Sequence, residues 1–154
     1  MKLKVMLDPG AIMPTRAHST DAGLDLYAPY DFLLPQSSAR NEETVWGLPA
    51  KVGSHTVDTG VHMEIPAGYV GMIKSKSGLN VKNGIISEGV IDSGYTGSIR
   101  VKLYNLGNEN IVFRKGQKIS QIVIMPIITP EPEQVESLGE TERGDGGFGS
   151  TGKF

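Results

Sequence analysis

Residues 56–65 read TVDTGVHMEI, and this stretch decides the fold class. Its odd-numbered positions, which alternate with polar or small ones, are Val57, Thr59, Val61, Met63 and Ile65. An alternation with period two is typical of a β-strand that buries one face. The stretch therefore predicts a strand whose apolar side faces a protein core.

Four further segments share this β-rich composition. They are rich in Val, Ile, Tyr and Met, and they are Lys2–Leu7, Tyr69–Lys74, Ser98–Tyr104 and Lys118–Ile128. Turn sequences separate the segments, namely Pro66-Ala67-Gly68, Asn83-Gly84 and Leu106-Gly107. Helical periodicity is almost absent, because Gly or Pro interrupts each window in which it begins. The chain is therefore expected to form one all-β domain of the sandwich, jelly-roll or small-barrel type.

Composition narrows the classes of function. The chain has 154 residues, the size of one domain, with Lys+Arg 15 against Asp+Glu 17, so a basic surface for nucleic acid is not expected. Cysteine is absent, which excludes disulfides, Cys-ligated zinc and thiol nucleophiles. No apolar run approaches the length of a membrane span, and the first ten residues, MKLKVMLDPG, lack the apolar region of a signal peptide. We therefore expect a soluble cytoplasmic protein with no membrane partner.

Two stretches interrupt the β pattern. Gln36–Gly53 reads as a surface excursion, in which Trp46 is expected to anchor the loop onto the domain. From Thr129 onward the chain is rich in Pro and Glu and too polar to form a core. The sequence thus predicts a β-barrel domain over residues 1–128 and a C-terminal arm over residues 129–154.

The end of this arm, RGDGGFGSTGKF, has the composition of an anion-binding loop, since glycines let backbone N–H groups turn toward a phosphate. It does not complete a Walker A motif, because Phe154 follows Lys153 and ends the chain. Arg143 offers a planar fork for phosphate oxygens, and Phe148 offers a ring that can stack on a base. A Gly/Ser-rich tail without a ligand is the alternative.

A second segment, residues 74–84, follows a strand and predicts one short helix. Ser77 is the expected N-cap and Gly84 the expected C-terminal stop. Lys76 and the free N–H groups of Ser77 and Gly78 together suggest an anion site, although most capped helix starts bind only water.

A third segment, residues 89–97, reads GVIDSGYTG and places an acidic residue at the end of an apolar strand. Asp92 can act there as a general base on water, and Tyr95 can cover one face of a sugar. The alternative is an ordinary hairpin turn at Asp92-Ser93-Gly94. The three histidines are scattered at spacings that fit neither a zinc site nor a catalytic triad.

Taken in order, five segments resemble the trimeric deoxyuridine triphosphatase (dUTPase) family. They are Ala22–Ala28, Lys76–Leu79, Gly89–Gly97, Arg114–Gln121 and Arg143–Gly152. The resemblance implies a distorted jelly-roll barrel with one short helix and a flexible C-terminal arm. It also implies a homotrimer in which each active site is assembled from three subunits.

The reaction implied by this resemblance is Mg²⁺-assisted hydrolysis of dUTP to dUMP and pyrophosphate, which limits uracil in DNA and supplies dUMP for dTMP synthesis. Asp92 matches the carboxylate that deprotonates the attacking water. Tyr95 matches the aromatic residue that packs on deoxyribose and excludes a 2′-hydroxyl. The magnesium ion would be carried by the phosphates and by water.

The resemblance also assigns substrate contacts. The hairpin from Ile86 to Arg100, including Gly89, Val90 and Ile91, matches the one that reads uracil through backbone groups. The phosphate contacts are expected at Lys76, Ser77, Gly78 and Gln121, with Arg143 on the γ-phosphate. Phe148 would stack over uracil, and Gly149, Ser150 and Thr151 would wrap the phosphates. Asp25 matches a carboxylate near the metal-bound waters, or it is a buried structural acid.

The sequence departs from the family pattern at Lys76, where arginine is usual, so this position lacks a bidentate fork. Two alternatives to a dUTPase function remain open.

The first is a dCTP deaminase, although these related enzymes need a glutamate where this chain has Lys102. The second is a regulatory protein of the same fold. A nucleotide-dependent regulatory module with little turnover would use the Gln36–Gly53 loop as its contact surface.

Overall fold

The stretch at residues 56–65 forms two strands and not the single strand predicted from the sequence. In the computed structural model, which describes residues 2–38 and 51–147, β4 is Gly53–Asp58 and β5 is Val61–Glu64. Gly60 adopts a φ of 64°, a left-handed conformation that glycine tolerates, and the chain bends there. The two-residue linker preserves the period of two, so the odd-numbered side chains from Val57 to Ile65 are all buried. The predicted core face is therefore confirmed across the bend.

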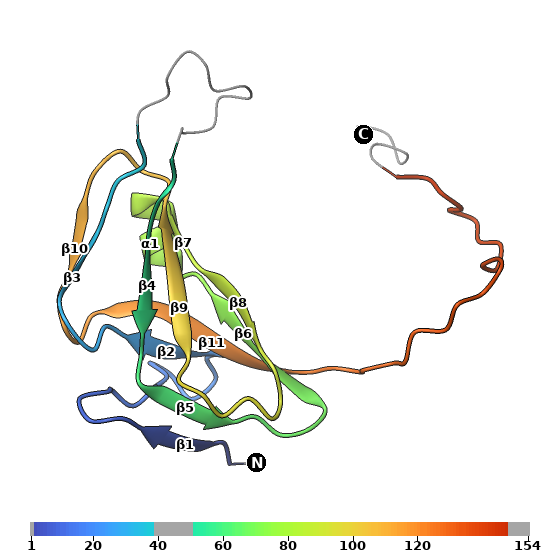
Figure 1. The fold of residues 1–154 in the computed structure, drawn as a ribbon, viewed down its shortest axis with the longest axis horizontal. Coiled ribbons are helices and arrows are strands. Elements are labelled where there is room, and N and C mark those ends of the chain that lie inside the picture. The colour runs from blue at the N-terminus through green and yellow to red at the C-terminus, as the bar shows by residue number, and fades with distance from the viewer. Residues whose placement is uncertain (1, 39–50, 148–154) are drawn as a thin grey trace.

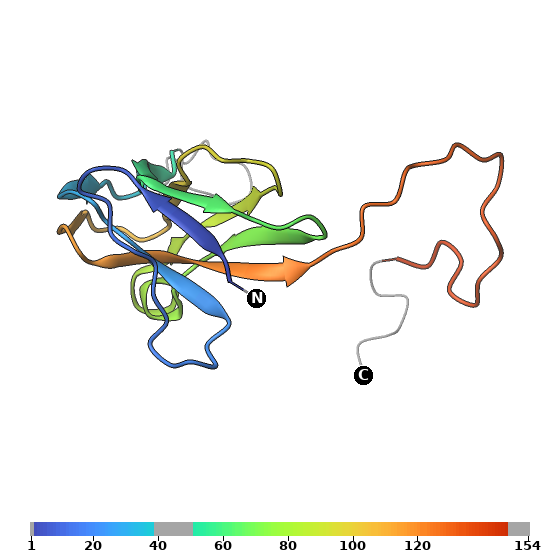
Figure 2. The same ribbon diagram turned by 90° about the horizontal axis from the view of Figure 1, so that it is seen from below.

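Nine other strands complete the described part of the fold (Figure 1). They are β1 (Lys4–Leu7), β2 (Gly23–Tyr27), β3 (Phe32–Leu34), β6 (Tyr69–Lys74), β7 (Ile85–Ile86), β8 (Glu88–Ile91), β9 (Arg100–Asn105), β10 (Ile111–Phe113) and β11 (Lys118–Pro126). The sheets have the orders β2-β11-β6-β8, β4-β9-β7, β1-β5 and β10-β3. All strand pairs are antiparallel, and the two views show the sheets facing one another around one interior (Figures 1 and 2). The architecture is the predicted all-β jelly-roll.

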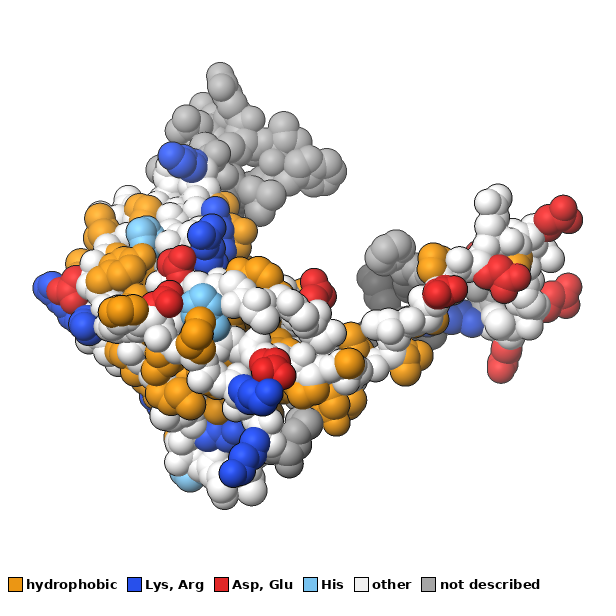
Figure 3. Space-filling model, turned by 60° about the horizontal axis from the view of Figure 1, so that its bottom comes forward, with side chains coloured by type: hydrophobic (Ala, Val, Ile, Leu, Met, Phe, Trp, Pro, Cys, Tyr) orange, Lys and Arg blue, Asp and Glu red, His pale blue; other side chains and the backbone are white. Residues whose placement is uncertain are grey.

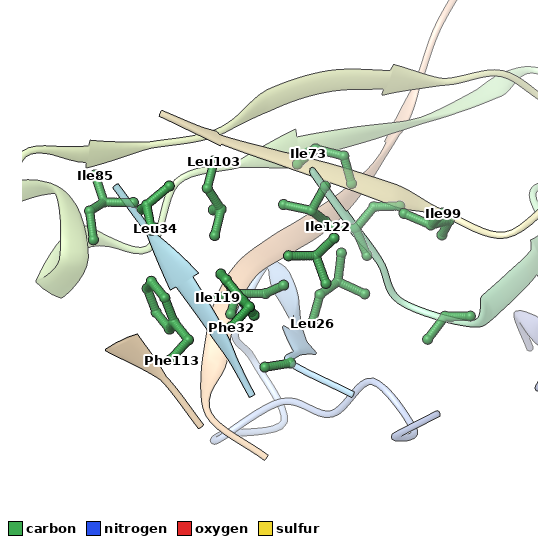
Figure 4. Packing of buried hydrophobic residues seen from close by; sticks show 14 of the residues in the cluster. Leu26, Phe32, Leu34, Ile73, Ile85, Ile99, Leu103, Phe113, Ile119 and Ile122 are labelled. Carbon is green, nitrogen blue, oxygen red and sulfur yellow. The ribbon is translucent and has the colours of Figure 1, made fainter. Parts of the chain in front are cut away.

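The core lies between these sheets. Leu26 and Ile122 from one sheet point toward Leu103 and Ile99 on the opposite side (Figure 4). Each of these four side chains is fully buried. Burying an aliphatic side chain contributes about 1.5–3 kcal/mol, so this apolar interior holds the strands that carry the polar groups described below.

The predicted helix exists as α1, Ser77–Asn83. Its N-cap is Lys76 and has no side-chain capping bond, so the prediction of Ser77 as N-cap is wrong by one residue. The predicted stop is confirmed, because Gly84 is left-handed at φ 66° and its N–H donates to the carbonyl of Asn80.

The chain leaves the barrel after β11. Its last backbone bond to the barrel joins the Ile127 N–H to the Gly68 carbonyl at 2.9 Å, and residues 128–145 are exposed. Figures 1 and 2 both show this segment running away from the sheets. Acidic side chains gather along it, whereas charges of both signs are interspersed on the barrel face in Figure 3. No helix in the described ranges has the length and apolarity of a membrane span.

Candidate active site

A buried carboxylate pairs with two lysines at the edge of the four-stranded sheet. Asp25 on β2 has a side chain only 5% exposed, and its Oδ1 lies 2.6 Å from Lys76 Nζ. Its Oδ2 lies 2.6 Å from Lys118 Nζ at the start of β11. The strand register places Gln121 of β11 opposite Asp25 on one side and Lys74 on the other. Residues far apart in the sequence thus meet on one row of the sheet.

The two lysines fix the charge of this group. Burial alone would raise the pKa of Asp25, but the hydrogen bonds from Lys118 and Lys76 outweigh burial and hold this pKa below its ordinary value. The same contact raises the pKa of Lys118. Lys118 was not identified from the sequence as a site residue. Its position within the Arg114–Gln121 segment is the signal that could have identified it.

These side chains line a hollow of about 360 Å³. Its wall includes Lys74, Lys76, Lys118, Asp25 and Gln121. Lys76 and Lys118 share Asp25, Lys74 pairs with Glu88 at 2.7 Å, and Asp21 also lines the hollow, so most of this positive charge is balanced by carboxylates. A phosphate chain bound here would meet ammonium groups that already have carboxylate partners.

Gln121 is held in this wall by local packing. Its Nε2 donates to the Ser75 carbonyl at 3.0 Å, and its side chain fills the space that a Cβ at Gly23 would need. Ser77 and Gly78 follow Lys76 directly and are exposed at the start of α1. The structure thus groups the predicted phosphate contacts Lys76, Ser77, Gly78 and Gln121 at one end of the barrel.

Replacing Asp25 with Asn is expected to destabilise the fold by about 2–3 kcal/mol at pH 7, because it leaves two partly exposed lysines without their partner. The lowered pKa means that the stabilisation is present above about pH 4 and is lost as the pH falls below it. The difference in unfolding temperature between wild type and Asp25→Asn should therefore shrink between pH 6 and pH 3. Glu64→Gln, which breaks the exposed Lys4–Glu64 pair, is the control and should change little. A constant difference across this pH range would contradict the role of the ion pairs.

The predicted catalytic segment forms a tight turn after β8. The Tyr95 N–H donates to the Asp92 carbonyl at 3.2 Å, and Gly94 has a φ of 87°, as a type II turn requires. The turn that was the alternative reading is therefore present, and it leaves the Asp92 side chain exposed. A carboxylate in this position can accept a proton from a water molecule.

Tyr95 has a fixed orientation in this turn although 45% of its surface is exposed. Its hydroxyl donates to the Ser98 carbonyl at 3.0 Å. A Cβ added at Gly97 would lie 2.5 Å from the Tyr95 hydroxyl oxygen, so the ring packs directly on the Gly97 backbone. The exposed face of the ring is a rigid apolar platform.

β8 lies at the edge of its sheet in the described structure and leaves one row of backbone groups free. Gly89 packs against Ile73, Val90 is 59% exposed, and Ile91 is half-buried. Ile86 lies on β7. Arg100 begins β9, where its Nε lies 3.3 Å from Asp58 Oδ2. Gly89, Val90 and Ile91 thus lie on the strand that leads to Asp92, whereas Ile86 faces Tyr104 at the other end of β9 from Arg100. In the described structure β8 pairs with β6 and not with β9, so the strand pairing of the predicted hairpin is not observed.

The two groups of predicted residues lie at opposite ends of one strand pair. Lys74 of β6 faces Glu88 of β8, whereas Gly71 faces Ile91. Lys76 extends beyond the first end and Asp92 beyond the second, which puts them about 20 Å apart at 3.4 Å per residue. A single chain therefore does not bring Asp92 to a phosphate held at Lys76.

The arm contributes one described site residue. Arg143 is exposed, and its Nε donates to the Gly146 carbonyl at 2.9 Å, a contact within the arm. Phe148, Gly149, Ser150 and Thr151 lie outside the described residues, as does Trp46.

The described residues do not fit a metal ion held by the protein alone. They contain no group of three or more His, Asp or Glu side chains placed around a common point. Both oxygens of Asp25 already face a lysine ammonium. A magnesium ion would therefore need phosphate and water oxygens as its main ligands.

Comparisons with known proteins identify the family of this chain. A family model described as dUTPase matches residues 10–152. A deoxyuridine 5′-triphosphate nucleotidohydrolase of Gloeothece citriformis is 40% identical, with 99% of this chain and 97% of the relative covered. Enzymes of the same name from Rattus norvegicus and Homo sapiens are 38% and 39% identical, but the chain spans only 66% and 53% of their lengths.

Solved structures with a similar fold are also dUTPases. The dUTPase of Staphylococcus bacteriophage 80alpha, solved with dUpNHpp, has a TM-score of 0.79 and 32% identity, with 98% of each chain covered. A mutant dUTPase of phage phi11 of S. aureus, described as coordinating a structural Mg(II) ion, has a TM-score of 0.75 and 28% identity, with 91% of this chain and 100% of that chain covered. On sequence and fold, the chain belongs to the dUTPase family.

Proposed function

We propose that this protein is a dUTP diphosphatase, which hydrolyses dUTP to dUMP and pyrophosphate. The observation that carries the proposal is the turn after edge strand β8, which presents an exposed carboxylate at Asp92 beside the fixed ring of Tyr95. Membership of the dUTPase family supports the same substrate.

In the proposed mechanism, Asp92 accepts a proton from a water molecule as the water oxygen attacks the α-phosphorus. The bond between the α-phosphorus and its bridging oxygen to the β-phosphate breaks, and pyrophosphate leaves with that oxygen. The ammonium groups of Lys76 and Lys118 stabilise the charge on the phosphate chain.

Selectivity follows from two features of the hairpin. The ring of Tyr95 packs against deoxyribose and leaves no room for a 2′-hydroxyl. The free backbone groups of β8 pair with the uracil edge, and cytosine would leave a buried group without a partner. Arg143 and the residues after it would close over the phosphates and base.

The site is proposed to be shared within a homotrimer. The separation of Lys76 from Asp92 supports this, because the second group must then come from another copy. The exposed segment after β11 supports it too, since its described part makes few contacts with its own barrel. Residues 1–128 would serve as the barrel domain and residues 129–154 as an arm that reaches a neighbouring copy.

Magnesium is proposed to enter with the substrate as Mg·dUTP, with Asp25 acting on its bound waters or staying a structural acid. Such an enzyme limits uracil in DNA and supplies dUMP for dTMP synthesis. The cytoplasmic location expected from the sequence stays a prediction.

The structure gives no support for deamination of dCTP, because Lys102 occupies the position where a dCTP deaminase needs a glutamate. Lys102 on β9 is exposed, and its Nζ lies 5.6 Å from the centroid of the Tyr104 ring. An ammonium there cannot replace a carboxylate that shuttles protons.

The proposal is tested by offering dUTP, dCTP, dTTP and UTP separately with Mg²⁺ and following pyrophosphate and ammonia. Only dUTP should release pyrophosphate at a substantial rate, and no substrate should release ammonia. Ammonia from dCTP would favour a deaminase, and equal cleavage of UTP and dUTP would contradict the assigned role of Tyr95.

A further inference from the structure

The loop that follows Asp92 is fixed from a neighbouring strand by His62. This residue lies on β5, with a side chain 17% exposed, and its Nδ1 lies 2.7 Å from the Thr96 carbonyl, next to Tyr95 in the chain. Its other ring nitrogen, Nε2, lies 3.2 Å from Asp8 Oδ2, an ion-pair distance without the geometry of a hydrogen bond. One imidazole therefore joins the segment after β1 to the loop that carries Tyr95.

The charge of His62 suits both contacts. The Thr96 carbonyl and the Asp8 carboxylate raise the pKa of His62, and Asp58 adds to the effect. A protonated imidazole donates from Nδ1 to the Thr96 carbonyl and carries the positive charge that the ion pair with Asp8 requires.

Asp58, the last residue of β4, holds the other end of the same loop. Its Oδ1 accepts the hydroxyl hydrogen bond of Ser98, and its Oδ2 faces Arg100. The carbonyl of Ser98 is the acceptor for the Tyr95 hydroxyl. Asp58 thus holds Ser98 in place, and Ser98 in turn orients the Tyr95 side chain.

The backbone reinforces these contacts at the bend between β4 and β5. The Thr59 N–H and hydroxyl donate to the Ile99 carbonyl at 3.1 and 2.7 Å, and the Ile99 N–H donates to the Val61 carbonyl at 2.8 Å. Thr59 and Ile99 are buried, so this junction is rigid. The junction therefore holds the backbone next to Asp58 and His62 in a fixed position relative to the loop.

On the basis of these contacts we propose that Asp58 and His62 are positioning residues for the catalytic turn, holding Tyr95 and Asp92 in their working geometry. The inference rests on the proposed function. Neither residue lies in the five segments that resemble the family, and neither touches the substrate in this account. Their effect passes through Thr96 and Ser98.

The test uses the full chain with His62→Leu and Asp58→Asn. Kinetics with dUTP and UTP are measured beside amide hydrogen exchange of the ligand-free protein. We expect each variant to lower kcat/KM for dUTP about 10–100-fold, as the loss of a charge-assisted hydrogen bond allows, and to narrow the preference for dUTP over UTP. Amides of residues 93–98 should exchange about tenfold faster, while those of the core strands keep their protection.

Three further variants sharpen the result. His62→Gln, which can still donate to the Thr96 carbonyl, should recover part of the activity lost in His62→Leu. Gly97→Ala, which displaces the Tyr95 ring directly, should narrow the dUTP preference in the same way. Glu64→Gln is the matched control on β5, because Glu64 pairs with Lys4 at the surface, and it should leave kinetics and exchange unchanged.

The outcomes separate this inference from the proposed function. A wild type that does not cleave dUTP would defeat the proposed function, and exchange at residues 93–98 would still decide whether the two residues hold the loop. Wild-type kinetics and exchange in both variants would overturn the inference. So would faster exchange over the whole barrel, which would show a general loss of stability. If His62→Leu does not fold, Asp58→Asn and Ser98→Ala give the same readouts.

Discussion

Asp92→Asn is expected to lower the rate of pyrophosphate release from dUTP by about 10²–10⁴-fold, the usual contribution of a general base. The amide has nearly the shape of the carboxylate but cannot accept the proton of the attacking water. The side chain is exposed at a turn, so the protein should keep its unfolding temperature. The Kd for a non-hydrolysable dUTP analogue should change little, since Asp92 acts on water and not on the nucleotide.

Single-turnover kinetics and analogue binding check this expectation together. Ser93→Ala changes the next residue of the same turn and is the matched control, which should keep most of its activity. A variant Asp92→Asn with near wild-type turnover would show that another group deprotonates the water. A variant that fails to bind the analogue would show that Asp92 serves binding.

Removal of residues 143–154 should abolish turnover with dUTP while leaving the barrel folded. The described part of the arm is exposed and its last backbone bond to the barrel is at Ile127, well before the cut. The truncation removes Arg143 and the glycine-rich end, so the substrate loses groups expected to close over it. We expect at least a 10²-fold fall in kcat/KM, consistent with the loss of several phosphate contacts, and an unfolding temperature within a few degrees of wild type.

Mixing two inactive proteins tests whether the sites are shared. Truncated chains keep Asp92, and Asp92→Asn chains keep the arm, so trimers refolded from a mixture should regain part of the activity that each protein lacks alone. Failure to regain activity, despite proof of mixed trimers, would contradict a shared site. Unfolding of the truncated chain would show instead that the arm stabilises the barrel.

Much of the fold could be predicted because it depends on local pattern. The alternation from Val57 to Ile65 identified a buried face even though Gly60 bends the chain. The strand Tyr69–Lys74 and the stop at Gly84 were predicted at their observed positions. In each case the side chains themselves carry the signal, as alternating hydrophobicity or as tolerance of a positive φ.

Other elements escaped prediction for physical reasons. The strands β3 and β10 have three residues each, too few to show an alternation, and they are defined by pairing with one another. The N-cap of α1 is Lys76, whose backbone is extended and whose side chain makes no capping bond, so a search for a capping side chain pointed to Ser77 instead.

The candidate site was predicted only where its residues lie in recognisable segments. Lys118 pairs with Asp25, and His62 reaches Thr96, across long stretches of sequence. Such contacts are set by strand order and register, which the local pattern does not encode. In the proposed shared site, the meeting of Asp92 with a phosphate chain would depend on a second copy of the protein, so it would follow from neither the sequence pattern nor one folded chain.

The proposed reaction cleaves dUTP by attack of water on the α-phosphorus. Hydrolysis in water enriched in ¹⁸O, followed by mass spectrometry of both products, tests it most directly. Attack on the α-phosphorus should give one labelled oxygen in dUMP and none in pyrophosphate after a single turnover. Label in pyrophosphate, or label in inorganic phosphate with dUDP as the other product, would contradict it.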